Sequence, residues 1–420
     1  MENIFEIQTA AGVQPIEDRV GRELTAQLSA DIALLKTNYT GIRWNIADDE
    51  KVIEYIGSNA LKTKLMNWID NSAKPCEVKK DGTDFAYLVN TEGIASSTNW
   101  LRRVSGASSH YNTSDKADYL QMVELENINV AELIDEDTGT HSILFNFDEL
   151  TPTGFHRWFH EHTKLMSRYD LTFHGQDANA TTVDCCKGNS QPSGNFSFNN
   201  IQTLVAATGA KILKWTAWEI AVLAWLQAYR FGTFDVPNTE RGRGLQDGGE
   251  AAARGWVSGT TDSLTTPHGG VNQDGNGGYR FMYMENPTDG KQWLMGFGWR
   301  GMNGRAYFTY DDFKANAAAL MPIEDADDDH TYPTDLSASY AKEVNLLGIA
   351  KDKNGSSTTG FYDGNWSNTE NDRIFYAGGN TNGGVICGAF ARDVDSDVSN
   401  AYWGRRGRCA MRKSSVVAAS

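Results

Sequence analysis

The segment 365–410 constrains the fold of this chain more than any other part of it. Gly, Asn, Ser and Asp separate short β-prone runs there, among them Asn365-Trp366-Ser367, Phe375-Tyr376-Ala377-Gly378-Gly379 and Gly404-Arg405-Arg406-Gly407-Arg408. Residues of these types at this spacing predict a ribbon of short strands and open loops, and they exclude a long helix. The C-terminal end of the chain is therefore expected to be β-rich.

The N-terminal part has a different texture. Apolar residues recur every three or four positions from Val13 to Tyr39, and again from Val52 to Ile69, so helices are predicted over 13–39 and 48–70. The first pattern fits both a single amphipathic helix and a short oligomerising coil. Residues 1–73 are therefore predicted to be a helical region for assembly or attachment.

A β-rich region is predicted for residues 74–166. Asp81-Gly82 lies between two β-prone runs within 77–88, which is the signature of a hairpin. Further strands are expected at Leu120–Leu125 and Ser142–Phe147.

One large domain is predicted for residues 167–420. Its strongest element is a helix from Thr216, a plausible N-cap with Glu219 three residues on, to about Arg230, with Gly232 after its end. The predicted fold class is thus α+β, with a helical N-terminal region, a small β-rich middle domain and this C-terminal domain.

Charge and cysteine usage exclude several classes of partner. The net charge of −16 and the pI near 5.0 argue against a nucleic-acid partner, which needs a basic surface. The apolar run 212–231 contains charged residues, so a buried helix is expected there and no membrane insertion. The first residues lack the pattern of a signal peptide, and five cysteines, two of them adjacent, suit a reducing cytoplasm.

The segments 214–221 and 365–410 resemble the C-type-lectin-like domains of phage receptor-binding proteins, in the branch that includes formylglycine-generating enzymes. Lys74-Pro75-Cys76 and the run 122–125 resemble segments that precede this domain in phage fibre proteins. Variable proteins of diversity-generating retroelements belong to the same group. The resemblance covers roughly residues 170–420 and implies a small twisted sheet that carries long loops.

Metal and cofactor sites are not predicted. His156, His160 and His162 lack the spacing of a zinc motif and are interpreted as surface or interface histidines. The acidic run 324–329 lacks the glycine and distal glutamate of an EF-hand loop, so a solvated loop is expected. Calcium-dependent sugar binding is unsupported, because Glu285-Asn286-Pro287 has the wrong order for the lectin motif.

No catalytic residue is predicted either. The resemblance would require a closely spaced cysteine pair for formylglycine-generating chemistry, whereas Cys387 and Cys409 are far apart in sequence. Neither has a basic partner that would activate a thiolate, and Cys185-Cys186 do not replace the pair. An enzyme of this type remains the less favoured alternative.

A binding surface is the remaining interpretation. No Lys, Glu, Gln or Met occurs between Asn371 and Ala410. Adenine-directed mutation of Asn codons ending in C cannot produce these four residues. Their absence therefore fits diversification by a retroelement. It also fits the chance composition of a Gly/Asn-rich ribbon. The predicted ligand-facing residues are small polar, aromatic or charged, as in other adaptable binding loops: Tyr376, Asn380, Thr381, Asn382, Arg392, Asp393, Asp395, Tyr402 and Arg405. The predicted scaffold residues are Trp366, Phe375, Phe390 and Trp403.

The resemblance implies a virion protein, a phage head or tail fibre subunit made in the host cytoplasm, that binds a host-surface glycan or protein. Its N-terminal region would contact other virion proteins, and a homotrimer is expected because fibres of this type usually are trimers. The main alternative is a purely structural virion component whose lectin-like domain contacts neighbouring proteins.

Overall fold

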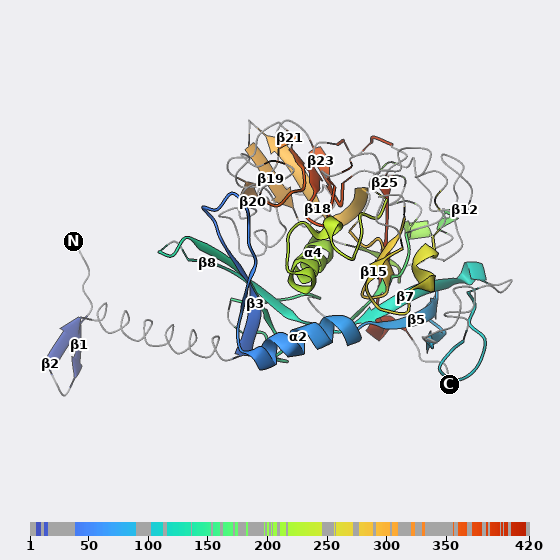
Figure 1. The fold of residues 1–420 in the computed structure, drawn as a ribbon, viewed down its shortest axis with the longest axis horizontal. Helices are drawn as coiled ribbons and strands as arrows, with labels where there is room; N and C mark the ends of the chain where they lie inside the picture. The colour runs from blue at the N-terminus through green and yellow to red at the C-terminus, as the bar shows by residue number, and fades with distance from the viewer. Residues whose placement is uncertain are drawn as a thin grey trace.

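The fold is described from a computed structural model of the chain (Figure 1). The described residues are mainly 6–9, 12–15, 38–89, 102–111, 116–135, 137–152, 154–159, 163–170, 211–215, 217–245, 258–271, 277–288, 360–367, 372–379, 387–394, 399–401 and 405–416, together with the strands of 173–183 and 291–331 and a few isolated positions.

A five-stranded sheet forms one side of the body. Its order is β10-β8-β9-β3-β4, and all its neighbours are antiparallel. The strands are β3 (Tyr39–Asn45), β4 (Glu54–Ile56), β8 (Asn129–Asp135), β9 (Thr140–Asn146) and β10 (His156–Arg157). Alternate residues such as Ile42, Trp44 and Ile143 point into the main core, as the two-residue period of a strand requires. Ala131 and Leu144 lie in a small second cluster with Phe155.

Helix α2 (Asn59–Asn71) packs beside this sheet. Ser58 precedes it in an extended conformation, and its hydroxyl accepts a hydrogen bond from the Leu61 amide, which caps the first turn. Leu65 and Ile69, four positions apart, are fully buried. The helix therefore contributes one apolar stripe to the core and leaves its other face to solvent.

A six-stranded sheet lies next in the chain and collects strands from distant segments. Its order is β14-β26-β11-β7-β5-β6, all antiparallel. The strands are β5 (Lys74–Lys79), β6 (Phe85–Tyr87), β7 (Tyr119–Leu125), β11 (Lys164–Ser167), β14 (Leu213–Lys214) and β26 (Cys409–Arg412). The end of the chain is thus built into a sheet that begins at residue 74.

Helix α4 (Ala217–Phe231) lies at the centre of the body (Figure 1). Residues Ile220 to Ala224 are all fully buried, so this helix is apolar around most of its circumference, as a core helix is. It contacts α2 on one side and strands β18 and β23 on the other. Gly232, with φ of 71°, follows its last residue and ends it.

A larger sheet of eight strands covers the other side of α4. Its order is β20-β19-β18-β23-β24-β22-β21, with β25 paired to β18. The strands are β18 (Lys291–Met302), β19 (Arg305–Thr309), β20 (Met321–Ile323), β21 (His330–Thr331), β22 (Asn365–Ser367), β23 (Asp372–Ala377), β24 (Arg392–Val394) and β25 (Arg405–Arg406).

The smaller elements complete the described chain. A three-stranded sheet has the order β15-β16-β17, and β1 pairs with β2 and β12 with β13. Their bounds are β1 (Glu6–Thr9), β2 (Gly12–Pro15), β12 (Phe173–His174), β13 (Thr182–Val183), β15 (Gly269–Gly270), β16 (Tyr279–Phe281) and β17 (Met284–Glu285). Short 3-10 helices are η1 (Lys116–Asp118), η3 (Val236–Asn238), η4 (Thr260–Ser263) and η7 (Lys413–Ser415).

The predicted α+β class is confirmed at the coarse level, because helices and strands are both present and sheets predominate. The hairpin within 77–88, the strands near 120–125 and 142–147, and the helix ending before Gly232 are confirmed. Thr216, its predicted cap, lies outside the described residues.

Two helix predictions need correction. The helix predicted over 48–70 begins later than expected. Residues 54–56 form β4, Gly57 then turns the chain with a φ of 96°, and the helix follows its N-cap Ser58. Residues 12–15 form β2 and Tyr39 begins β3, while most of the predicted first helix lies outside the described residues.

The predicted boundaries at 73–74 and 166–167 do not separate independent units. Strand β3 pairs with β9, and β11 pairs with β26, so sheets and the core cross both positions.

Gly41 on β3 offers a test of the five-stranded sheet. A Cβ at this position would lie 2.0 Å from the Ile143 carbonyl oxygen, so Gly41→Ala forces β3 and β9 apart. We expect a loss of about 2–3 kcal/mol in the free energy of unfolding, measured by urea denaturation. Leu133→Ala, at a half-exposed position of the same sheet, is the control and should cost less than about 1 kcal/mol. A Gly41→Ala variant as stable as the native chain would contradict the close approach of β3 and β9 at Gly41 and Ile143.

Candidate functional site

The C-terminal ribbon, residues 365–410, is divided between the two larger sheets. Strand β24 lies between β22, to which it is parallel, and β23, to which it is antiparallel. Strand β25 then runs parallel to β18, and β26 crosses into the six-stranded sheet between β11 and β14. Both ends of the ribbon are therefore fixed by backbone hydrogen bonds.

An aromatic anchor holds the middle of the ribbon against α4. Phe390 is fully buried, with its ring centroid 4.8 Å from that of Trp225 and 5.6 Å from that of Phe234. Trp225 in turn stacks on Trp44 of β3 at 5.9 Å. Contacts of this kind add about 0.5–1.5 kcal/mol per pair beyond burial. The ribbon is thus packed onto the same aromatic core as the five-stranded sheet.

Asp363 fixes the turn that precedes β24. Its carboxylate accepts a hydrogen bond of 2.8 Å from the Phe390 amide, and a Cβ on Gly388 would lie 2.3 Å from its Oδ1. Only glycine fits at position 388 for this reason. Burial raises the pKa of Asp363 to about 8. The carboxyl group is therefore largely protonated at neutral pH, and it acts here as a hydrogen-bonding group of the core.

Arginines of the ribbon serve as internal anchors. Arg392 is buried, and its Nη1 donates to the carbonyls of Ala389 and Ala391 at 2.8 and 2.9 Å. Arg406 and Arg408 are also buried, and both pair with Asp170, at 3.0 and 3.1 Å. Buried charges stabilise only when they are paired and hydrogen-bonded, as Arg406 and Arg408 are with Asp170.

Arg408 makes further contacts beyond its ion pair. It donates to the Ser167 carbonyl at 3.0 Å and to the Glu285 carbonyl, and its guanidinium lies 5.0 Å from the Trp215 ring centroid. These bonds tie the last strand of the chain to β11 and β17. Arg392, which was predicted to face a ligand, is thus part of the interior, as are Arg406 and Arg408.

Among the described residues of the ribbon, the exposed ones lie in the loop between β24 and β25. Ser399, Asn400 and Ala401 are exposed, whereas residues 391–393 before the loop and 406–410 after it are buried. Asp397 shapes the loop, because its Oδ1 accepts hydrogen bonds from the amide and the hydroxyl of Ser399 at 2.8 and 2.6 Å. We call the described residues of this loop, 396, 397 and 399–401, the exposed loop.

The structure changes the list of predicted ligand-facing residues. Tyr376, Arg392 and Asp393 are buried, with exposed fractions of 0, 3 and 4%, so the expectation that they lie on an open loop surface is wrong. All three belong to the paired strands β23 and β24, whose neighbours cover them. Only the backbone of Arg405 is described, in β25. The other predicted contacts lie outside the described residues: Asn380, Thr381, Asn382, Asp395 and Tyr402.

The scaffold predictions stand as follows. Phe390 is confirmed as a core residue, and Trp366 on β22 is half-buried. Phe375 is described only in its backbone, in β23, and Trp403 lies outside the described residues.

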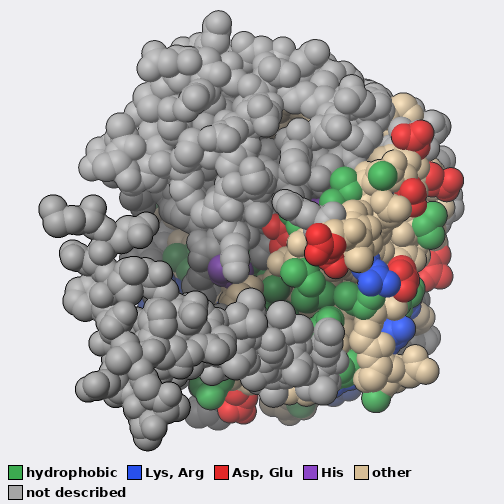
Figure 2. Space-filling model, turned by 90° about the vertical axis from the view of Figure 1, so that its left-hand side faces the viewer, with side chains coloured by type: hydrophobic (Ala, Val, Ile, Leu, Met, Phe, Trp, Pro, Cys, Tyr) green, Lys and Arg blue, Asp and Glu red, His purple; other side chains and the backbone are tan. Residues whose placement is uncertain are grey.

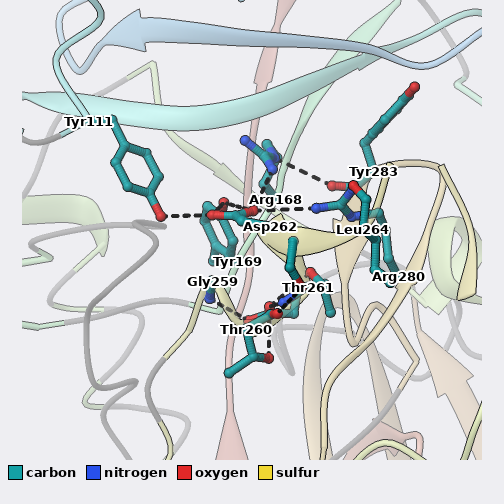
Figure 3. A network of polar contacts seen from close by, with 12 residues as sticks. Tyr111, Arg168, Tyr169, Gly259, Thr260, Thr261, Asp262, Leu264, Arg280 and Tyr283 are labelled. Carbon is teal, nitrogen blue, oxygen red and sulfur yellow. Dashed lines mark hydrogen bonds and ion pairs between the residues drawn. The ribbon is translucent and has the colours of Figure 1, made fainter. Parts of the chain in front are cut away.

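Sequence reasoning missed a buried polar cluster centred on Asp262 (Figure 3). Its carboxylate accepts hydrogen bonds from the Tyr111 and Tyr169 hydroxyls at 2.7 Å each, and it pairs with Arg168 at 2.8 Å and Arg280 at 3.4 Å. These residues are widely separated in sequence, so no motif spacing could have shown the cluster. Tyr111 lies between β6 and η1, Arg168 and Tyr169 follow β11, and Arg280 lies on β16.

A second buried carboxylate lies next to this cluster. Glu285 accepts hydrogen bonds from the Gly259 and Thr261 amides, both at 2.9 Å, and from the Thr261 hydroxyl (Figure 3). Burial, with the nearby charge of Asp262 second, raises the pKa of Glu285. Through its hydrogen bonds to Gly259 and Thr261, Glu285 on β17 holds η4, the short helix that carries Asp262.

The cluster around Asp262 is structural in character. Burial, followed by the like charge of Arg168, lowers the pKa of Arg280 to about 10, which still leaves it charged at neutral pH. Its carboxylates and guanidinium groups are hydrogen-bonded to one another and to backbone groups, and Arg168 and Asp262 are almost fully buried. Such an arrangement holds the segments that carry these residues together.

The other predicted sites give no chemistry among the described residues. His156 lies on β10 instead of a helix, and its ring contacts Trp218 edge-on, while His160 and His162 lie outside the described residues. The acidic run 324–329 and Cys185-Cys186 also lie outside them. The described part of the chain holds no group of three or more His, Cys, Asp or Glu placed to bind a metal.

The cysteines named in the alternative enzyme hypothesis are buried. Cys387 and Cys409 are reduced thiols with no exposed surface, as is Cys76 on β5. Burial, the largest effect, raises the pKa of the Cys76 thiol, so it is not an activated nucleophile.

No protein-family model matches the chain, and no curated protein matches it significantly in sequence. Among the described helices, none combines the length and the apolar character that crossing a bilayer requires.

Asp262→Asn tests the cluster. The substitution keeps the shape of the side chain but removes the charge that neutralises the buried Arg168 and Arg280. We expect a loss of about 3–5 kcal/mol in the free energy of unfolding, measured by urea denaturation. Asp137→Asn, at an exposed position of the β8–β9 turn, is the control and should change stability by less than about 0.5 kcal/mol. A loss below about 1 kcal/mol for Asp262→Asn would contradict the assignment of Asp262 as the charge partner of both arginines.

Proposed function

We propose that the chain is a bacteriophage fibre subunit, from the head or the tail, that binds a host-surface ligand through a C-type-lectin-like C-terminal domain. The observation that carries the proposal is the separation, among the described residues of the ribbon, between a buried, arginine-anchored frame and the exposed loop with Ser399, Asn400 and Ala401. A rigid frame that holds a short polar loop at the surface is the usual basis of adaptable recognition.

The composition of the ribbon supports the same function. Lys, Glu, Gln and Met are absent between Asn371 and Ala410, the residues that adenine-directed diversification of Asn codons cannot supply. The buried anchors Phe390, Arg406 and Arg408 would tolerate no such variation, because each has partners in other segments. Variation confined to exposed positions would leave the fold intact.

The charge distribution favours a ligand recognised by hydrogen bonds and contact area. Arg392, Arg406 and Arg408 are buried, so these cations cannot reach an anionic ligand. The chain has a net charge of −16, and Figure 2 shows several acidic side chains scattered over the described part of one face. An acidic protein is repelled by a polyanionic surface at long range. Neutral groups of a host glycan or protein fit this loop better.

The N-terminal region is proposed to attach the subunit to other virion proteins, in a homotrimer formed in the host cytoplasm. The apolar repeat between β2 and β3, from Ile16 to Leu35, supports this role, since its spacing suits a helix that pairs with copies of itself. Because sheets join the regions on either side of residues 73–74, attachment is assigned to the residues before β3.

Two alternatives follow from specific features. A purely structural virion component would use the exposed loop as a contact to a neighbouring protein, and the loop would then be buried in the particle. An enzyme of the formylglycine-generating type would need an accessible thiolate. The complete burial of Cys387 and Cys409 disfavours it.

The genome that encodes the chain provides a test of diversification. We expect a second, near-identical copy of the sequence encoding residues 365–410 beside a reverse-transcriptase gene, with differences concentrated at adenines. The substituted codons should encode positions of the exposed loop and not Phe390, Arg406 or Arg408. Substitutions spread evenly over buried anchors and exposed positions would contradict the assignment of the loop as the variable surface.

Adsorption to host cells provides a test of binding. Purified full-length protein should compete with the phage that encodes it and slow adsorption to host cells. The double variant Ser399→Arg, Asn400→Arg should lose most of this competition, at least about tenfold in apparent affinity, because it places two long side chains on the exposed loop. The stability of the variant should change by less than about 1 kcal/mol, since both positions are exposed.

Asp137→Arg, in the exposed β8–β9 turn, is the matched control and should compete like the native protein. Competition by the native protein with no loss in the loop variant would place the ligand elsewhere. The purely structural alternative would be favoured by three results together. The native protein would not compete, immunogold labelling would find the chain on virions, and an antibody against the loop would not reach it there.

A further inference from the structure

The hairpin turn between β16 and β17 has an unusual backbone. Phe281 pairs with Met284, and the two residues between them, Met282 and Tyr283, have φ of 50° and 61°. A two-residue turn with both φ positive is normally built from Asn and Gly, because other side chains are strained there. Such strain persists only where the surroundings hold it in place.

Two bonds from the preceding loop hold the turn. The Met282 amide donates to Nδ1 of His268 at 3.2 Å, and the Tyr283 amide donates to the Pro267 carbonyl at 3.1 Å. Met282 is fully buried, so its amide would have no water to replace His268 as acceptor. Loss of such a bond leaves a buried donor unsatisfied.

The bond from Met282 fixes the state of the imidazole. Since Nδ1 accepts a hydrogen bond, it carries no proton, and the ring proton is on Nε2. Nε2 lies 3.0 Å from Oδ1 of Asp70, at the end of α2. Asp70 also receives a hydrogen bond of 2.9 Å from Nε of Arg230 on α4. The neutral imidazole thus bridges the strained turn and the carboxylate between the two helices.

The charged groups around His268 come from several elements. Asp70 belongs to α2 and Arg230 to α4, and Glu240 lies 3.9 Å from Arg230. Arg280 on β16 is directed to other partners, the carbonyls of Leu264 and Thr266 and the carboxylate of Asp262. Asp70 would stabilise a protonated ring, whereas Arg230 would oppose it. Only the neutral ring can accept the Met282 bond.

We propose that His268 is an acid-sensitive lock: its neutral form holds the strained Met282–Tyr283 turn closed, and its protonation releases the turn. A second proton enters at Nδ1, the atom that accepts the Met282 amide. Two N–H groups then face each other, and the turn loses one of the two bonds that it makes to the preceding loop. The protonated ring then moves toward the Asp70 carboxylate, with which it forms an ion pair.

Release of the turn affects the cluster around Asp262. The strand that follows the turn carries Glu285, whose amide donates to the Arg168 carbonyl at 2.7 Å and whose carboxylate holds η4. Arg168 also donates to the Tyr283 carbonyl at 3.4 Å. Opening at residues 282–283 therefore loosens the contact between β17 and η4. The lock joins the ends of α2 and α4 to this part of the fold.

The direction of the pH dependence follows from the burial of the ring. Burial, the largest effect, lowers the pKa of His268 below its ordinary value of 6.5. The unfolded chain therefore binds this proton at higher pH than the folded chain does. The contribution of His268 to stability is complete above about pH 6.5, and it falls as the pH drops from there through the lower folded pKa.

Hydrogen exchange of the full-length protein tests the lock. Between pH 7 and pH 5, after correction for the intrinsic pH dependence of exchange, the protection of the Met282 amide should fall by at least about tenfold. The Ile143 amide in the five-stranded sheet, remote from His268, is the internal reference and should keep its protection. Equal protection of Met282 at both pH values would overturn the proposal.

His268→Asn is the matched variant, because its Oδ1 can accept from Met282 but cannot be protonated. In this variant the protection of Met282 should not depend on pH. The same loss of protection in His268→Asn would assign the effect to another group. If the variant does not fold, nitrogen chemical shifts of the native protein decide: His268 should be the Nε2-protonated tautomer at pH 7, and a protonated Nδ1 at that pH would exclude the lock.

Discussion

The carboxylate of Asp262 is the interaction on which the arrangement of the described chain depends. It accepts from two tyrosines and pairs with two arginines that come from three separate segments. Inside the protein each of these groups would be costly without its partner, so the segments can pack only in the one arrangement that satisfies all of them. Glu285 extends the same constraint from η4 to β17 and, through the Glu285 carbonyl, to Arg408.

Helix α4 supplies the apolar counterpart of this polar constraint. Its side chains are buried on several sides, and Trp225 contacts Trp44 of the five-stranded sheet and Phe390 of the ribbon. Helix α4 therefore joins the five-stranded sheet and the ribbon through a shared aromatic core. The ribbon needs this support, because its own strands are two to six residues long and its glycines provide no side chains to pack.

The sequence was informative where the cause of structure is local. The Asp-Gly hairpin follows from turn chemistry, strands β7 and β9 from short β-prone runs, and helix α4 from a capping pattern followed by a long apolar run that ends at Gly232. The helix predicted over 48–70 began too early, because the apolar period continues through β4 and does not show the break at Gly57. The partners of Asp262 and the burial of Arg392 depend on contacts between distant segments. No spacing in one sequence reveals these contacts, and a charged residue is by default placed at the surface.

The burial of arginines in the ribbon explains how stability and recognition can be separated in one short segment. Arg406 and Arg408 are fixed by Asp170, and Arg392 by its own neighbouring carbonyls, so the frame of the ribbon does not depend on the loop between them. The exposed loop is shaped mainly by Asp397, which bonds to Ser399 within the loop itself. Among the described residues of the ribbon, Ser399, Asn400 and Ala401 are the exposed ones. Exposed positions tolerate substitution better than the buried anchors do, and this tolerance is the physical condition that a variable surface requires.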